Sequence, residues 1–290
     1  MSRRTTPLIG AHMSIAGGYE RAVEAAAECG MDVVQLFTKN NNQWRGKPIS
    51  DDDVTRFRDS LSRLRIRHPL SHSSYLINLG SSDETLWRKS VDALIVELQR
   101  AELLGIAYVV VHPGAAVGAD ESVGLDNIVR GLDEIHDSHP ALKAKLALEN
   151  TAGQGSCLGW RFEQLAYLLE HVRQPDRLGV CFDTCHAFAA GYPLAERKDY
   201  LATFREFDQW IGVERIVAFH LNDSKREFGS RVDRHEHIGR GHVGLEAFRH
   251  LLNDKRFRDT PMYLETPKGD HEGRSWDAIN LATLRALTAS

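Results

Sequence analysis

Residues 81–113 read SSDETLWRKSVDALIVELQRAELLGIAYVVVHP and predict one helix followed by one strand. Apolar side chains recur every three or four residues, which predicts a helix over residues 84–104 with its buried stripe at Trp87, Val91, Leu94, Leu98 and Ala101. Ser81 with Glu84 predicts a capping box at the start of this helix, and Gly105 can end it. The apolar run 108–112 then predicts a buried strand that ends at a histidine.

The same alternation of strand and helix repeats along the chain. Candidate strands cover residues 8–12, 33–37, 69–72, 108–112, 146–149, 179–183, 217–221 and 261–265. Eight strand-then-helix units without a Pro/Gly/Ser-rich linker predict the α/β class and a single (β/α)₈ TIM-barrel catalytic domain over residues 1–290. An open doubly wound sheet is the alternative, but no G-x-G-x-x-G follows the first strand.

Composition excludes several classes of protein. The chain has 36 Lys+Arg against 40 Asp+Glu, a formal charge of -4, so its global charge does not predict attachment to nucleic acid. The longest run without a charged or strongly polar residue is the nine residues 103–111, about half of the ~18 that span a bilayer. Four cysteines without a C-x-x-C pair do not form a disulfide framework. We therefore expect a soluble, cytoplasmic protein with no membrane partner.

Most predicted strands end in a side chain that can bind a metal. In a β/α barrel all carboxyl ends of the strands open onto one face, where the loops build the active site. Imidazoles and carboxylates crowded there would repel one another and pay for desolvation unless a cation gathers them. The residues at or beside these ends are His12, His72, His112, Glu149, Asp183, His220 and Glu265.

Two further segments enlarge this set. The sixth strand continues as DTCH, which places His186 three residues beyond Asp183, and the loop after the seventh strand carries Asp233 and His235 in an Asp-x-His step. His12 aside, nine candidate ligands result, too many for one ion. Imidazole and carboxylate ligands without cysteine suit Zn²⁺ best, with Mn²⁺ or Fe²⁺ as alternatives.

Seven segments together resemble the endonuclease IV family of apurinic/apyrimidinic endonucleases (AP endonuclease family 2). They stand in family order and cover essentially the whole chain: HSSYLINLG (72–80), VVVHPG (109–114), LENTAGQG (148–155), GVCFDTCH (179–186), HLNDSK (220–225), GSRVDRHEHIG (229–239) and LET (264–266). The resemblance implies a β/α barrel with three zinc ions. It also implies a DNA-repair hydrolase that cuts duplex DNA 5′ to an abasic site, leaves a 3′-hydroxyl and a 5′-deoxyribose phosphate, and removes 3′-blocking groups.

The resemblance also distributes the nine ligands over three ions. It implies that the first zinc is bound by His72, His112 and Glu149. Glu149 would also bind the second zinc, together with Asp183, His220 and Glu265. The third zinc would be bound by His186, Asp233 and His235. Mn²⁺ is an alternative at one site. Such a cluster lowers the pKa of water toward ~7 and so supplies a nucleophile near neutral pH. Glu149 and Glu265 are the catalytic candidates, and Glu265 is preferred as proton acceptor.

Two loops and several cations are candidates for contact with DNA. The loop after the second strand carries Asn42, Gln43 and Trp44, and the loop after the third carries Tyr75 and Leu76. Apolar wedges bend DNA, and an abasic nucleotide resists extrusion least; the alternative is that these side chains pack against helices. Relatives often carry arginine at the position of Asn42, and some carry an acidic residue at that of Ser73. Loop cations that are candidates to contact phosphates include Lys39, Lys225, Arg231 and Arg234; the alternative for each is a solvated surface charge.

Two rival functions remain open at this point. A metal-dependent TIM-barrel sugar isomerase or epimerase would use a similar mouth, but one or two metals would suffice for it. A zinc-stabilised DNA-binding protein without activity is the other rival. The preferred partner is duplex DNA with abasic sites or blocked 3′ ends, bound by a monomer. The histidines at 136, 139 and 171 are expected on the surface, and His12 is expected to form hydrogen bonds near the cavity.

Overall fold

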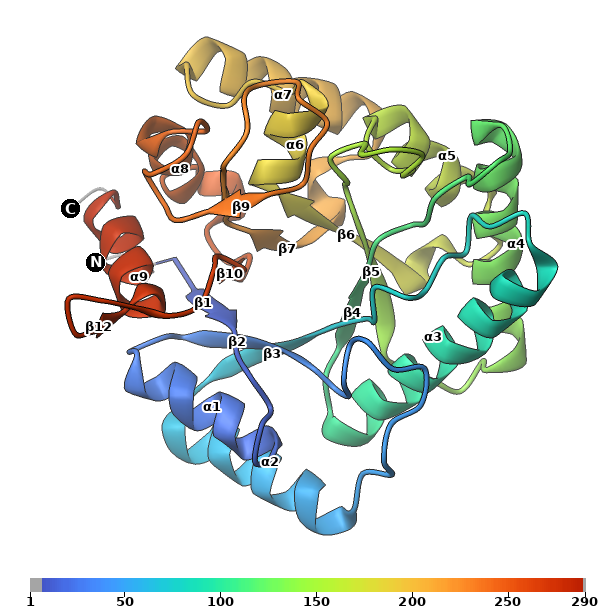
Figure 1. Ribbon diagram of the computed structural model, residues 1–290, viewed down its shortest axis with the longest axis horizontal. Coiled ribbons are helices and arrows are strands. Elements are labelled where there is room, and N and C mark those ends of the chain that lie inside the picture. Colours follow the sequence, from blue (N-terminus) through green and yellow to red (C-terminus); the bar gives the residue numbers. More distant parts are fainter. Residues whose placement is uncertain (1–6, 289–290) are drawn as a thin grey trace.

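Eight short apolar segments pair side by side into a closed parallel barrel in the computed structural model, which describes residues 7–288 (Figure 1). Around the barrel the order is β1-β10-β7-β6-β5-β4-β3-β2. The barrel strands are β1 (Ile9–His12), β2 (Val33–Phe37), β3 (Arg67–His72), β4 (Tyr108–Val111), β5 (Lys145–Glu149), β6 (Leu178–Asp183), β7 (Ile216–His220) and β10 (Met262–Leu264). The eight-strand prediction is confirmed, with ends that differ by one or two residues.

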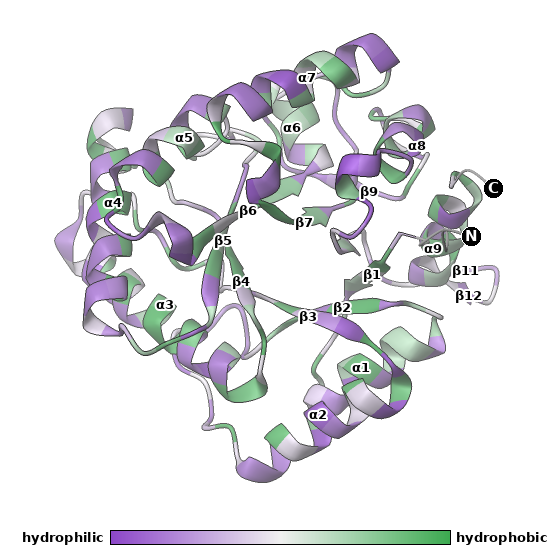
Figure 2. Cartoon of the chain, turned by 180° about the vertical axis from the view of Figure 1, so that it is seen from behind, coloured by the Kyte–Doolittle hydropathy of each residue, from purple (hydrophilic) through white to green (hydrophobic). Residues whose placement is uncertain are grey.

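Helices surround the barrel on its outside, as Figure 1 shows. In Figure 2 they carry alternating hydrophilic and hydrophobic bands, as expected for helices that are buried on one side only. They are α1 (Tyr19–Glu28), α2 (Asp51–Leu64), α3 (Glu84–Leu104), α4 (Glu121–Ser138), α5 (Phe162–His171), α6 (Thr184–Ala190), α7 (Arg197–Trp210), α8 (Leu245–Leu252) and α9 (Trp276–Ala286). Within residues 7–288, no helix is both long and apolar enough to cross a membrane.

Helix α3 begins and ends for local chemical reasons. Gly105 follows it in the left-handed conformation (φ 78°) and ends it as the sequence predicts. The predicted capping box of Ser81 with Glu84 is wrong, because Asp83 is the N-cap. The Asp83 carboxylate accepts hydrogen bonds from the amides of Thr85 and Leu86, and a carboxylate there is also favoured by the helix dipole.

Two short antiparallel pairs lie in the loops that follow the seventh and eighth barrel strands. Strand β8 (Asp223–Ser224) pairs with β9 (His235–Glu236), and β11 (Asp270–His271) pairs with β12 (Arg274–Ser275). The first pair matters for the site, because it returns the chain from Ser224 so that His235 stands beside it.

The barrel interior is filled in layers. One layer is a small apolar cluster of Leu8, Val33, Leu70, Val110, Ala147, Cys181, Ala218 and Tyr263. Because side chains alternate along a strand, the residue two positions further on points into the same interior. Those residues form the next layer, toward the carboxyl ends, and seven of them are polar: Gln35, His72, His112, Glu149, Asp183, His220 and Glu265.

Candidate metal centre

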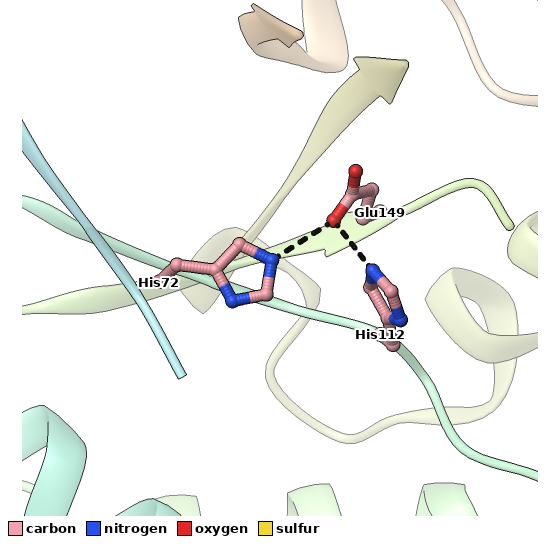
Figure 3. A group of neighbouring side chains, drawn as sticks. All are labelled: His72, His112 and Glu149. Carbon is pink, nitrogen blue, oxygen red and sulfur yellow. Dashed lines mark hydrogen bonds and ion pairs between the residues drawn. The ribbon is translucent and has the colours of Figure 1, made fainter. Parts of the chain in front are cut away.

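The first group of potential ligands comes from β3, β5 and the residue after β4. Glu149 Oε2 lies 3.2 Å from His72 Nε2 and 3.0 Å from His112 Nε2, so both imidazoles converge on one carboxylate oxygen (Figure 3). The Nδ1 atom of His72 donates to the Ser73 carbonyl at 2.8 Å. That bond places the proton on Nδ1 and leaves the Nε2 lone pair facing the cluster.

The second group shares Glu149 with the first. Glu149, Asp183, His220 and Glu265 each offer an atom within 4.8 Å of the others. His220 Nδ1 lies at their centre, 2.8 Å from Glu149 Oε1 and 3.2 Å from Glu265 Oε2. Three carboxylates around one imidazole carry more negative charge than the imidazole can balance, which is the arrangement a divalent cation stabilises.

The third group lies between β6, α6 and β9. Asp183, His186 and His235 offer atoms within 4.8 Å of one another. Asp233 also faces this group, because its Oδ1 is 3.2 Å from His186 Nε2 and 3.4 Å from His235 Nε2. Asp183 therefore stands between the second and third groups, as Glu149 stands between the first and second.

Two nitrogens in the third group test whether a cation fits. His186 Nδ1 donates to the Asn150 carbonyl at 2.9 Å, and His235 Nδ1 donates to the Glu265 carbonyl at 3.2 Å. Both Nε2 atoms are buried and have no hydrogen-bond partner in the part of the chain that the structure describes. Two buried imidazole nitrogens that face carboxylate oxygens must hold either a proton or a cation between them. The residues present therefore fit a bound metal.

Burial and neighbouring charges oppose each other in setting the charges of these side chains. Burial opposes ionisation of Glu149, but His220 and His112 outweigh it and hold the pKa of that carboxyl well below its usual range. Burial also disfavours a charged His186, yet Asp183 and Asp233 outweigh it and raise the pKa of His186 well above its usual value. Positive charge at this mouth is thus favoured, and protons on imidazoles supply it where a metal is absent.

Comparison with known proteins agrees with this geometry. Residues 23–287 match the model of a family described as a xylose isomerase-like TIM barrel. The chain is 49% identical over 280 residues to a probable endonuclease 4 of Geobacter sp. (strain M21), covering 97% of this chain and 98% of that protein. The crystal structure of endonuclease IV from Thermus thermophilus is similar at a TM-score of 0.86 and 39% identity, covering 97% of this chain and 98% of that one. The chain belongs to the endonuclease IV family.

A more distant solved structure shows that the fold of this endonuclease IV homologue is widely shared. A D-tagatose 3-epimerase-like protein is similar at a TM-score of 0.72 and 21% identity, covering 96% of each chain. Because such proteins share this fold, the residues at the strand ends do not by themselves distinguish an endonuclease from a sugar isomerase. Membership of the endonuclease IV family confirms the resemblance that the seven segments carry, and the closed barrel confirms the fold class.

Two asparagines that sequence reasoning missed hold the ligands of this endonuclease IV homologue in place. Asn222 donates from Nδ2 to Asp183 Oδ2 at 2.6 Å and accepts the Glu265 amide at 2.8 Å. Asn150 accepts the Asp183 amide at 2.7 Å and donates to the Asp183 carbonyl. Both asparagines are buried, and each lies within two residues of a proposed ligand, which is the signal that could have found them.

The loop residues expected to contact DNA differ in how freely they are presented. Tyr75 is 56% exposed, and its ring centroid lies 5.3 Å from that of His72, at the rim of the metal centre. Asn42 and Gln43 are also exposed, while Leu76 is half-buried. Trp44 is partly buried against the hydrophobic core, and the Lys89 ammonium of α3 lies 4.2 Å from the centroid of its ring. This packing agrees with the alternative that Trp44 packs against a helix.

The loop cations also divide into two kinds. Lys225, Arg231 and Arg234 are exposed, and the Arg231 guanidinium lies over the Trp160 ring at 3.8 Å. Lys39 is different, because its side chain is only 2% exposed and its ammonium lies 2.9 Å from Glu97 Oε1. The expectation that Lys39 contacts phosphate is therefore wrong, since a buried, paired ammonium cannot reach a duplex.

Among the remaining histidines one expectation is confirmed and one is wrong. His12 Nδ1 lies 3.0 Å from Gln35 Nε2, so it does form a hydrogen bond beside the cavity. The expectation that His136 lies on the surface is wrong, because it is 1% exposed on α4. It continues the buried face of that helix after Ile128, Leu132 and Ile135.

Proposed function

We propose that this chain is a zinc-dependent AP endonuclease that hydrolyses the phosphodiester 5′ to abasic sites in duplex DNA. The products would be a 3′-hydroxyl and a 5′-deoxyribose phosphate, and the same site would remove 3′-blocking groups. The observation that carries the proposal is the trio of linked ligand groups at one barrel mouth, with two buried imidazole nitrogens left for a cation. Membership of the endonuclease IV family supports damaged DNA as the substrate.

We assign the ligands from these groups, taking Asp233, whose Oδ1 faces both imidazoles of the third group, as the carboxylate of the third ion. His72, His112 and Glu149 would hold one ion; Glu149, Asp183, His220 and Glu265 a second; His186, Asp233 and His235 the third. Bound divalent cations would supply Lewis-acid stabilisation of the phosphate and a water of lowered pKa. Zn²⁺ suits this imidazole and carboxylate set best, and Mn²⁺ at one site is compatible with it.

The two catalytic glutamates would have different roles. Glu149 is fully buried, and both its oxygens are taken by imidazoles, so it orients His72, His112 and His220 rather than moving a proton. The Glu265 side chain retains 10% exposure. Glu265 can therefore accept the proton of the attacking water within the mouth.

Substrate would be held by the exposed loops around this mouth. Tyr75, beside His72, and Leu76 would enter the base stack next to the abasic nucleotide. Asn42 and Gln43 would contact the duplex, with Trp44 supporting them from its partly buried place, while Lys225, Arg231 and Arg234 would bind phosphates. These contacts position the scissile phosphodiester over the ligand groups. A monomer presents the complete set of loops, so we propose that one chain acts alone.

The test uses one sample for activity and metal content. A duplex with a single abasic analogue, labelled at the 5′ end, is incubated with protein of measured zinc stoichiometry. We expect about three zinc ions per chain and a single product that a polymerase can extend from its 3′-hydroxyl.

Glu265→Gln is the matched variant for the chemical step. It keeps the size and one oxygen of the side chain but cannot accept a proton, so we expect a loss of kcat of about 10²–10⁴-fold with little change in duplex affinity. Because Glu265 is also a proposed ligand, the comparison uses variant protein whose measured zinc content equals that of the wild type. Undamaged duplex serves as the control substrate. Failure of fully metal-loaded wild-type protein to cut the abasic strand would contradict the proposal, as would fewer than two zinc ions per chain.

A further inference from the structure

Strand β2 is the barrel strand that offers the mouth no His, Asp or Glu. Its sequence is VVQLF, and Gln35 occupies an interior position beside His12 of β1, with which it pairs in register. The Gln35 side chain is fully buried. A buried amide must use its donors and acceptor within the protein, so its partners show what it does.

Gln35 contacts two ligands of the second group at once. Its Nε2 donates to Glu265 Oε1 at 2.5 Å, and its Oε1 lies 2.7 Å from His220 Nε2. The other Nε2 proton points to His12 Nδ1 at 3.0 Å. Both donors and the acceptor of the amide are therefore used inside the mouth.

Only one orientation of this amide is chemically acceptable. With the NH₂ group toward Glu265, one proton meets a carboxylate and the other meets the His12 ring nitrogen. The reversed orientation would place the amide oxygen against the Glu265 carboxylate, with two acceptors in contact. The Gln35 oxygen must therefore face His220.

That orientation fixes the tautomer of His220. An amide oxygen accepts only, so His220 Nε2 must carry a proton. Nδ1 is then the nitrogen left to hold either a proton or a cation, and it is the atom 2.8 Å from Glu149 Oε1 and 3.2 Å from Glu265 Oε2. The nitrogen that faces the carboxylates is thus the one left able to bind a cation.

We propose that Gln35 is a positioning residue of the metal centre: it sets the tautomer of His220 and the orientation of Glu265, and so organises the second group for its ion. The inference rests on the proposed metal centre, but not on which DNA reaction the centre performs. Partners behind metal-binding histidines change metal affinity by about 10–100-fold when they are removed.

The first test replaces Gln35 by methionine, which keeps the length of the side chain and removes its hydrogen bonds. Zinc affinity is measured by competition with a chromophoric chelator, and zinc per chain is measured after dialysis. We expect the affinity for one ion to fall by about 10–100-fold, with the other ions retained.

Gln164→Met is the matched control. Gln164 is also buried and accepts the amide of Gly159 at 2.8 Å and that of Trp160 at 3.2 Å, but it touches no proposed ligand. If Gln35 had only a structural role, Gln35→Met and Gln164→Met would both lose thermal stability and would both keep the zinc affinity of the wild type. Equal zinc affinity in Gln35→Met and Gln164→Met would overturn the proposal.

A second test needs no variant of Gln35, so it stands even if Gln35→Met does not fold. Zinc-loaded wild-type protein with ¹⁵N-labelled histidine is examined by NMR, and the His220 signals are assigned by their loss in His220→Gln. We expect the proton on Nε2 and the metal on Nδ1; a proton on Nδ1 would overturn the inference. Incision of abasic duplex by the same sample reports separately on the proposed function.

Discussion

Two buried polar networks at the mouth of the barrel balance their charges in different ways. One is the metal centre. The other, which we call the α3 brace, consists of Lys39, Glu97 and Arg100. Glu97 on α3 pairs with Lys39 at 2.9 Å and accepts the Thr38 hydroxyl at 2.9 Å and the Ser74 amide at 3.2 Å. Arg100, one turn further along, binds the Thr38 carbonyl at 2.5 Å and the Lys47 carbonyl at 2.7 Å.

The brace contains permanently charged Lys and Arg side chains, and the metal centre does not. Thr38, Lys39 and Lys47 belong to the loop after β2, and Ser74 belongs to the loop after β3, so α3 holds both loops from beneath. These are the loops that carry Asn42, Gln43, Trp44, Tyr75 and Leu76. The difference teaches that the proposed DNA-contacting loops are ordered by the chain alone, whereas the ligand cluster needs an ion from solution to balance its charge.

Removal of metal should give the largest effect and should separate the two networks. With free zinc at about a thousand times its Kd, each bound ion contributes about 4 kcal/mol to the free energy of unfolding. Chelation removes the contribution of every ion together with incision. Calorimetry with and without chelator measures the loss.

Hydrogen exchange then shows whether the brace survives chelation. We expect the Ser74 amide, bound to Glu97, to keep its protection relative to global unfolding, and the Asp183 amide, bound to Asn150 within the cluster, to lose protection. Equal loss at both amides would show that the brace depends on the metal and would break the comparison.

Breaking the brace from its cationic side should give the next largest effect. Lys39→Met leaves the Glu97 carboxylate buried without its ammonium, and loss of one partner of a buried pair costs about 3–5 kcal/mol. Urea unfolding of zinc-loaded protein measures it, and zinc per chain should stay unchanged. The double variant Lys39→Met/Glu97→Gln should recover most of the stability, because the amide is neutral and still accepts hydrogen bonds.

An exposed pair on the same helix provides the control for this prediction. Arg88 and Glu134 form an ion pair between α3 and α4, each side chain being more than a third exposed. Arg88→Met should therefore cost less than about 1 kcal/mol. If Lys39→Met costs no more than Arg88→Met, burial of the brace has no energetic weight and the contrast with the metal centre fails.

The metal centre was predictable from the sequence, and the brace was not. Each proposed ligand in the barrel wall lies two residues beyond an apolar interior residue, as His72 follows Leu70 and Glu149 follows Ala147, so strand periodicity alone brings them together. Asp233 and His235 could be named as candidates from their Asp-x-His step, but the β8–β9 pairing that places them at the site has no strong sequence signal. Gln35 was missed because an amide inside a strand looks like any polar residue.

The brace could not be predicted because its partners lie far apart in the sequence. Lys39 stands among polar loop residues and gives no local sign that it is buried. Its partner Glu97 falls on the buried stripe of α3, between Leu94 and Leu98, where an isolated carboxylate would be costly. That conflict is a signal that a cation must reach Glu97, but it does not say which one.

His136 is a buried polar group of a third kind. Its substitution should have the smallest effect on stability among these predictions. It has neither a metal nor a counterion at Nδ1, which has no hydrogen-bond partner within residues 7–288. Burial, and then the charge of Arg177, lower the pKa of His136 to about 4, although Asp133 and Asp137 act in the other direction. His136 is therefore neutral in the folded protein at neutral pH.

Because the folded pKa of His136 lies below the unfolded value, its stabilising effect is complete above about pH 6.5 and is lost as the pH falls toward 4. Between pH 7.5 and pH 5 the loss should be about 2 kcal/mol. His136→Gln should remove this part of the pH dependence, whereas His171→Gln, at an exposed position, should keep it. Because metal binding also changes with pH, the quantity to compare is the difference in the free energy of unfolding between the two variants at each pH. Parallel pH profiles for the two would show that a neutral buried imidazole contributes nothing here and that only paired or metal-bound polar groups govern this fold.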